Sequence, residues 1–231
     1  MMKWLFSLLF LLYLSPVSAA PLPNLDKAYE FQQGQLLSSQ FEMNWQLIEI
    51  GPSVDALQKT SKRLLKALGN KNQPYTVTLV KRNDINAFSF PNGRIYVTKG
   101  LINYVQNQDE LAFVIAHEIG HQEHGDFLWA ANRYIQQELG KAFGPTSAAQ
   151  MERFKNIAGA AVITSGYGVE REYWADAFSL RLVKKAKFNP KAGLKLFQRL
   201  LQDSQSMDEA DGHPSLKNRA DKQEELLHLK P

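Results

Sequence analysis

The sequence predicts a mostly helical α+β fold with a small antiparallel or mixed sheet. Most of the chain carries apolar residues at helical spacing, whereas strand-forming residues concentrate between residues 75 and 98. The next long helical stretch, residues 109–125, contains the sequence His117-Glu118-Ile119-Gly120-His121. We therefore expect a few strands packed among helices, one of which carries a pair of histidines.

Length and composition are those of one globular domain. The chain has 231 residues, 44% hydrophobic and 22% charged, which suffices for one core and excludes a disordered chain. The formal net charge is only +4, and the lysines lie at helical spacing beside apolar residues. A solvated helix face explains them better than a nucleic-acid site. Cysteine is absent, which excludes disulfides and thiol chemistry.

Residues 1–20 have the pattern of a secretory signal peptide. A short basic start is followed by an apolar stretch at residues 4–14 and by small residues that resemble cleavage sites. We expect cleavage to leave one domain, residues 21–231, in a bacterial-type periplasm, where nucleic acid is not an expected partner. The alternative is a membrane-tethered protein that keeps Met1–Ala20, although the apolar stretch is short for a bilayer span.

Apolar periodicity and turn signals predict the individual elements. Helices are expected at residues 22–49, 54–68, 100–105, 109–124, 127–139, 154–166, 169–186, 190–203 and 216–229. Strands are expected at residues 75–80, 86–90 and 94–98, the last two joined as a hairpin by Pro91-Asn92-Gly93. The central helix has Asn107 or Asp109 as its cap and Gly125 as its stop. Residues 154–166 are interpreted as a core helix rather than a lid.

The motif HExxH predicts a metal site. On a helix, positions i and i+4 lie one turn apart on the same face, so His117 and His121 can direct two imidazole nitrogens at one metal ion. Glu118 lies about 100° around the helix, where it can reach a water on that metal. Two neutral imidazoles, an open position and a carboxylate base are what a zinc hydrolase needs.

A catalytic zinc needs a third protein ligand besides the two histidines. His124 ends the same helix but lies well around from the pair, so we interpret it as structural or solvent-facing. The pattern HExxHxxGxxH, which supplies a third histidine, is absent. These observations favour a carboxylate as the third ligand.

Several motifs together resemble one family. HEIGH is followed by Glu172-Tyr173-Trp174-Ala175-Asp176, and then by His213-Pro214 with Arg219 beyond. This pattern is similar to that of the HtpX/Oma-type zinc metalloendopeptidases, a gluzincin family related to periplasmic BepA-type proteases, and the resemblance covers roughly Tyr75 to Arg219. It implies a zincin-like domain. Without repeats or several membrane helices, the chain looks like a compact secreted member.

The resemblance implies roles for the two acidic residues of the second motif. Glu172 would be the third zinc ligand, and Asp176 would accept a hydrogen bond from a ligand histidine. Positions i and i+4 share a helix face, which agrees with both roles. The alternative is a solvated helix face on which these acids pair with Arg171 or Arg181.

The resemblance also implies roles outside the metal ligands. His213 would stabilise the oxyanion during turnover or occupy the open zinc position at rest. Arg219 would orient Asp176 or the C-terminal segment. The segment Asn86-Ala87-Phe88 would form an edge strand against which an extended substrate pairs.

The expected function is therefore zinc-dependent endopeptidase activity, with one Zn²⁺ per subunit and Glu118 as general base. Extended or unfolded polypeptides are the expected partners, in particular misfolded or misassembled envelope proteins, and peripheral membrane association fits either interpretation of the N-terminus. The alternative is a chaperone-like protein that binds peptides at the same site with little proteolysis. The intact Glu118 argues against this alternative.

Overall fold

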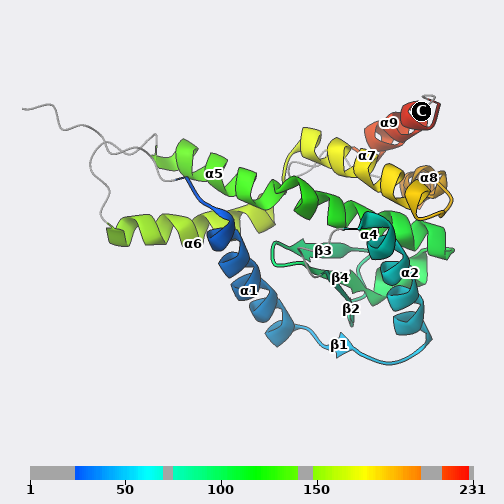
Figure 1. Cartoon of the computed structure of the whole chain (residues 1–231), viewed down its shortest axis with the longest axis horizontal. Coiled ribbons are helices and arrows are strands. Elements are labelled where there is room, and N and C mark those ends of the chain that lie inside the picture. Colours follow the sequence, from blue (N-terminus) through cyan, green and yellow to red (C-terminus); the bar gives the residue numbers. More distant parts are fainter. Residues whose placement is uncertain (1–23, 70–74, 140–147, 204–214, 229–231) are drawn as a thin grey trace, which may run out of the picture.

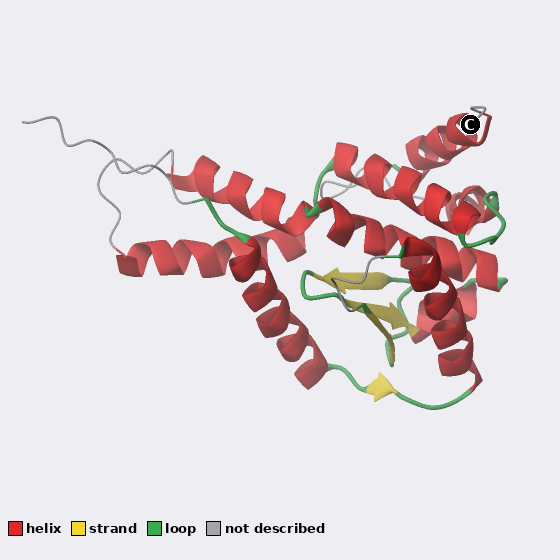
Figure 2. Ribbon diagram, viewed as in Figure 1, coloured by secondary structure: helices red, strands yellow, loops and turns green. Residues whose placement is uncertain are grey.

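A computed structural model describes residues 24–69, 75–139, 148–203 and 215–228. Within these ranges the chain forms a four-stranded sheet surrounded by helices (Figures 1 and 2). The strands are β1 (Leu47–Ile48), β2 (Thr76–Val80), β3 (Ala87–Phe90) and β4 (Arg94–Thr98). The helices are α1 (Lys27–Asn44), α2 (Pro52–Leu68), α3 (Lys99–Tyr104), α4 (Gln108–His124), α5 (Asp126–Leu139), α6 (Ala148–Ser165), α7 (Val169–Lys185), α8 (Ala192–Asp203) and α9 (Leu216–His228). The predicted signal peptide and His213 lie outside the described residues.

The sheet has the order β1-β2-β4-β3, so β3 forms one of its edges. The hairpin of β3 and β4 is antiparallel, as the turn at Pro91-Asn92-Gly93 predicts, with Phe88 opposite Tyr96. β2 pairs in parallel with β4 rather than with its neighbour in sequence. The expected α+β fold with a small mixed sheet is thus confirmed. The helix expected over residues 22–49 is wrong at its C-terminal end, because α1 stops at Asn44 and Leu47–Ile48 instead pair with β2 as strand β1.

Each face of the sheet is covered by helices. Alternation along β4 sends Ile95 and Val97 to one face, where they join the main core with α2 and α4. Tyr96 points to the opposite face and packs with Phe90, Leu37 and Phe41, so α1 covers that side. The sheet therefore lies between α1 and the pair α2 and α4.

α4 runs through the middle of the molecule, and both of its ends are capped. The side chain of Asn107 accepts hydrogen bonds from the backbone N–H groups of Asp109 and Glu110, 3.1 and 3.0 Å away. Gly125 ends the helix in the left-handed conformation, with φ of 69°. These caps agree with the sequence signals and fix which residues of α4 point toward its neighbours.

A buried ion pair fixes α8 against the first turn of α4. Glu110 is 1% exposed and accepts hydrogen bonds from both terminal nitrogens of Arg199, at 3.0 and 2.6 Å. The backbone N–H of Gln106 donates to the same carboxylate at 2.9 Å. The contact fixes the position of α8 relative to His117 and His121, which lie two and three turns further along α4.

α1, α5 and α6 form a helical arm to one side of the sheet (Figure 1). Tyr29, Phe127 and Ala158 belong to its own small apolar cluster, separate from the main core. Val162 is buried there, but Ile157 is 50% exposed, so α6 is only partly the core helix expected from its composition. No helix within the described ranges is both long and apolar enough to cross a membrane.

Gly100 offers a test of the packing that supports the edge strand. An added Cβ would overlap the backbone carbonyl oxygens of Asn83 and Asp84, which cannot yield as a side chain can. We expect Gly100→Ala to lower the free energy of unfolding by about 1–3 kcal/mol, despite the better helix propensity of alanine. Urea titration measures the effect, with the exposed neighbour Lys99 changed to alanine as the control. Equal stability of the two variants would contradict this packing.

Candidate metal centre

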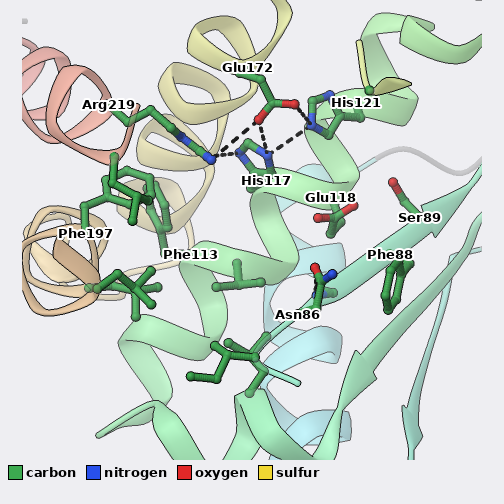
Figure 3. A pocket seen from close by; sticks show the side chains of 18 of the residues that line it. Asn86, Phe88, Ser89, Phe113, His117, Glu118, His121, Glu172, Phe197 and Arg219 are labelled. Atoms are coloured by element: carbon green, nitrogen blue, oxygen red, sulfur yellow. Dashed lines mark hydrogen bonds and ion pairs between the residues drawn. The ribbon is translucent and has the colours of Figure 1, made fainter. Parts of the chain in front are cut away.

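Two imidazoles of α4 meet at one point beneath α7. His117 and His121 are 8% and 4% exposed, and their Nε2 atoms lie 3.0 Å apart. Figure 3 shows both rings turned toward Glu172. The one-turn spacing of the motif therefore does bring the two nitrogens together.

α7 supplies Glu172, which is 1% exposed. Its Oε2 lies 3.4 Å from His117 Nε2, and its Oε1 lies 3.5 Å from His121 Nε2. α7 can approach α4 closely because Gly120 faces it, where an added Cβ would come within 3.3 Å of Ala175 Cα. The glycine inside the motif is thus part of what brings the carboxylate to the histidines.

Each histidine has a buried aspartate at its other nitrogen. His117 Nδ1 lies 2.9 Å from Asp176 Oδ1, and His121 Nδ1 lies 2.7 Å from Asp126 Oδ2. A carboxylate accepts a hydrogen bond, so both Nδ1 atoms carry a proton, and in the neutral rings the free lone pair is on Nε2. This is the tautomer in which both rings can bind a metal through Nε2.

The donor atoms fit a small divalent cation. In a tetrahedral site with Zn–N distances of about 2.0–2.1 Å, two ligand atoms lie about 3.3 Å apart. The corresponding distances here are 3.0, 3.4 and 3.5 Å, and the three residues are a possible metal-binding group. Two imidazole lone pairs this close repel each other unless a positive charge lies between them.

The electrostatics of the pocket favour positive charge. Burial lowers the pKa of His117, but hydrogen bonds to Asp176 and Glu172 outweigh burial and raise that pKa to about 10. Among the described residues around the pair, three buried carboxylates face the guanidinium groups of only two arginines, Arg171 and Arg219. Either a proton on His117 or a bound cation would neutralise the remaining negative charge.

α9 closes the side of the site around Asp176. Arg219 donates to both oxygens of Asp176, at 2.8 and 2.6 Å, and Gln223, one turn on, donates to the Asp176 backbone oxygen at 2.9 Å. Burial raises the pKa of Asp176, but Arg219 outweighs burial and holds that pKa below its usual range. The sequence left open whether Arg219 orients Asp176 or the C-terminal segment, and in the structure Arg219 contacts Asp176.

A cleft of about 830 Å³ opens beside the three metal-site residues. Asn86, Ala87 and Phe88 line one wall, and apolar side chains of α4 and α8, such as Phe113 and Phe197, line the other. Figure 3 shows Glu118 between the histidines and β3. A carboxylate in this position faces both the candidate metal site and anything bound along the edge strand.

The structure brings together all of the expected site residues that it describes: Asn86, Ala87, Phe88, His117, Glu118, His121, Glu172, Asp176 and Arg219. Asp126 and Gln223 had no predicted role. Tyr167 had none either, although its ring lies 4.7 Å from that of His121, in a loop where the glycines on both sides have positive φ. An acidic residue directly after the helix stop, and a tyrosine between two glycines, are signals that could have drawn attention to Asp126 and Tyr167.

A helix-borne histidine pair, a carboxylate from a second helix and an adjacent edge strand define a zincin-like domain of the metallopeptidase class. Residues 54–227 match the model of peptidase family M48. The chain therefore belongs to this family and is a metalloendopeptidase by class.

Three similar proteins carry names of the same class. Metalloprotease YcaL of Escherichia coli is 30% identical over 171 residues, 70% of this chain and 66% of that protein. Metalloprotease LoiP of Escherichia coli is 26% identical over 180 residues, 74% of this chain and 71% of that protein. Mitochondrial metalloendopeptidase OMA1 of Schizosaccharomyces pombe is 27% identical over 183 residues. That match covers 76% of this chain but only 53% of the yeast protein.

Metal addition should stabilise the fold through Glu172. A ligand at 100 times its dissociation constant adds about 2.7 kcal/mol to the free energy of unfolding, which raises Tm by roughly 5–10 °C for a chain of this size. We expect Zn²⁺ to produce this shift in the wild-type protein and a much smaller one in Glu172→Gln. Calorimetry with Glu170→Gln, an exposed position on the same helix, provides the control. An equal shift in all three proteins would contradict the site.

Proposed function

We propose that the protein is a zinc-dependent endopeptidase in which His117, His121 and Glu172 hold the metal. The observation that carries the proposal is that the donor atoms of these three residues lie 3.0 to 3.5 Å from one another. In addition, the Nδ1 atom of each histidine contacts an aspartate, which leaves Nε2 for the metal. A zinc ion bound there would act as a Lewis acid toward the scissile carbonyl and lower the pKa of water.

Glu118 is the general base of the proposed reaction. It takes a proton from the water whose oxygen bonds to the carbonyl carbon, and it delivers a proton to the nitrogen as the C–N bond breaks. Its side chain is half-buried and lines the cleft, so it can contact a bound peptide and still exchange with solvent afterwards. From the family pattern we further propose that His213 stabilises the oxyanion.

The edge strand β3 provides the proposed binding surface for the substrate. The carbonyl of Asn86 accepts a hydrogen bond from the N–H of Thr98 in β4. In an antiparallel pair, only every second residue directs its backbone N–H and C=O toward the partner strand. The polar backbone groups of Phe88 therefore face β4, whereas those of Ala87 and Ser89 face the open edge. An extended polypeptide can add to this edge as a further strand. Compact folded proteins cannot, which favours unfolded or misassembled substrates.

The proposed location is the periplasm, with envelope proteins as the substrates. The support is the secretory pattern of residues 1–20, together with the preference for unfolded chains that an edge-strand site imposes. Contact with the periphery of a membrane is compatible with this location.

Glu118→Gln separates chemistry from binding. Because the amide cannot accept the proton, we expect casein cleavage to fall by about 10²- to 10⁴-fold while zinc affinity stays unchanged. A chelator should abolish the wild-type activity, and added Zn²⁺ should restore it. Cleavage that resists the chelator would reject the metal mechanism, and a Glu118→Gln protein with full biological activity would favour the chaperone-like alternative.

Ala87→Pro tests the edge strand. Proline removes the N–H of Ala87, which donates to Asn86 Oδ1 at 2.8 Å until a substrate strand replaces that acceptor, but it leaves the ladder to β4 intact. One lost hydrogen bond of about 0.5–1.5 kcal/mol should lower kcat/KM on an unstructured peptide by roughly 2- to 12-fold. Ala87→Val, which retains the N–H, is the matched control. If the two variants cleave equally well and bind zinc equally, the substrate does not pair with β3 at this position.

A further inference from the structure

We infer that Asp126 is a positioning residue for His121 and that Arg171 and His124 hold Asp126 in that role. The inference rests on the proposed function, in which His121 is a metal ligand. It assigns a task to three residues that have none in the family pattern, on the side of the site opposite Asp176 and Arg219.

One carboxylate oxygen of Asp126 contacts the candidate metal ligand His121, and the other contacts Arg171 and His124. It is the first residue of α5 and has no exposed surface. Oδ2 lies 2.7 Å from His121 Nδ1, while Oδ1 lies 2.7 Å from Arg171 Nη1 and 2.8 Å from His124 Nδ1. Rotation of the carboxylate would break contacts at both oxygens, so its direction toward His121 is fixed.

Aromatic rings hold the two outer partners. The His124 ring stacks on that of Trp174, with centroids 3.8 Å apart and planes 6° apart. The guanidinium of Arg171 lies 4.1 Å from the centre of the Trp129 ring. The side chains of Arg171 and His124 are 17% and 30% exposed. The network thus extends from a buried metal ligand to the surface between α5 and α7.

Burial explains why Arg171 belongs to this network. A carboxylate without exposed surface has lost its hydration, and an opposite charge must compensate for that loss. Without Arg171, the Asp126 carboxylate would recover hydration free energy by turning from its buried position toward solvent. His121 would then lose the acceptor for its Nδ1–H, which selects the tautomer and the ring angle that direct Nε2 toward Glu172.

The two histidines are therefore held by separate parts of the fold. His117 depends on Asp176 of α7 and Arg219 of α9. His121 depends on Asp126, at the start of the helical arm. A change at Asp126 should alter the geometry of the bound metal without touching α9.

Metal binding by the full chain tests the inference without any peptide substrate. Zn²⁺ affinity is measured by competition with a chromophoric chelator, and the visible spectrum of the Co²⁺-loaded protein reports ligand geometry. The variants are Asp126→Asn, Arg171→Ala and Arg171→Lys. The matched control is Arg133→Ala, because Arg133 lies 5.2 Å from the centre of the same Trp129 ring but is not part of the Asp126 network.

We expect Asp126→Asn to weaken Zn²⁺ binding by about 10- to 100-fold, as is typical for partners of metal-bound histidines, and to change the Co²⁺ spectrum. Arg171→Ala should weaken binding in the same direction, Arg171→Lys should recover part of the loss, and Arg133→Ala should match the wild type. A merely structural role would lower Tm in these variants without changing the Co²⁺ spectrum.

Zinc affinities and Co²⁺ spectra that match the wild type in folded Asp126→Asn and Arg171→Ala would overturn the inference and leave the proposed function intact. A wild-type protein that binds no Zn²⁺ would overturn both. If Asp126→Asn does not fold, the comparison of Arg171→Ala with Arg133→Ala decides alone, and equal affinities in that pair would reject the inference.

Discussion

The close crossing of α4 and α7 is the constraint on which the site depends. It removes Glu172 and Asp176 from water and presses them against the two imidazoles. Carboxylates buried to this degree are stable only where hydrogen bonds and opposite charges meet them. The interactions that permit their burial are also those that orient the ligands, so stability and function cannot be separated at this crossing.

Local patterns predicted the parts of the site that lie close together in sequence. The i, i+4 relation of His117 and His121 holds in any α-helix, and the caps Asn107 and Gly125 are read from single residues. The hairpin of β3 and β4 follows from its turn in the same way. These features need no knowledge of what packs against them.

Other features depended on tertiary packing. Glu172 lies fifty-one positions beyond His121 on another helix, and only the resemblance to a family assigned it to the metal. The helix stop at Gly125 is predictable, but no sequence pattern shows that the turn there brings Asp126 back to His121. β1 has two residues, too few for an alternating pattern, and exists because β2 offers it an edge. The hydrogen bond from Gln223 to the Asp176 backbone oxygen depends on how α9 packs against α7, which the sequence of α9 does not reveal.

The contacts of α9 with Asp176 have a consequence for the order in which the protein becomes competent. Arg219 and Gln223 follow α4 and α7 in the chain by many residues. A polypeptide that emerges from synthesis or crosses a membrane N-terminus first therefore exposes the histidine helix long before the groups that orient His117 arrive. On the proposed function, the contacts that orient His117 would therefore be complete only after α9 has docked against α7.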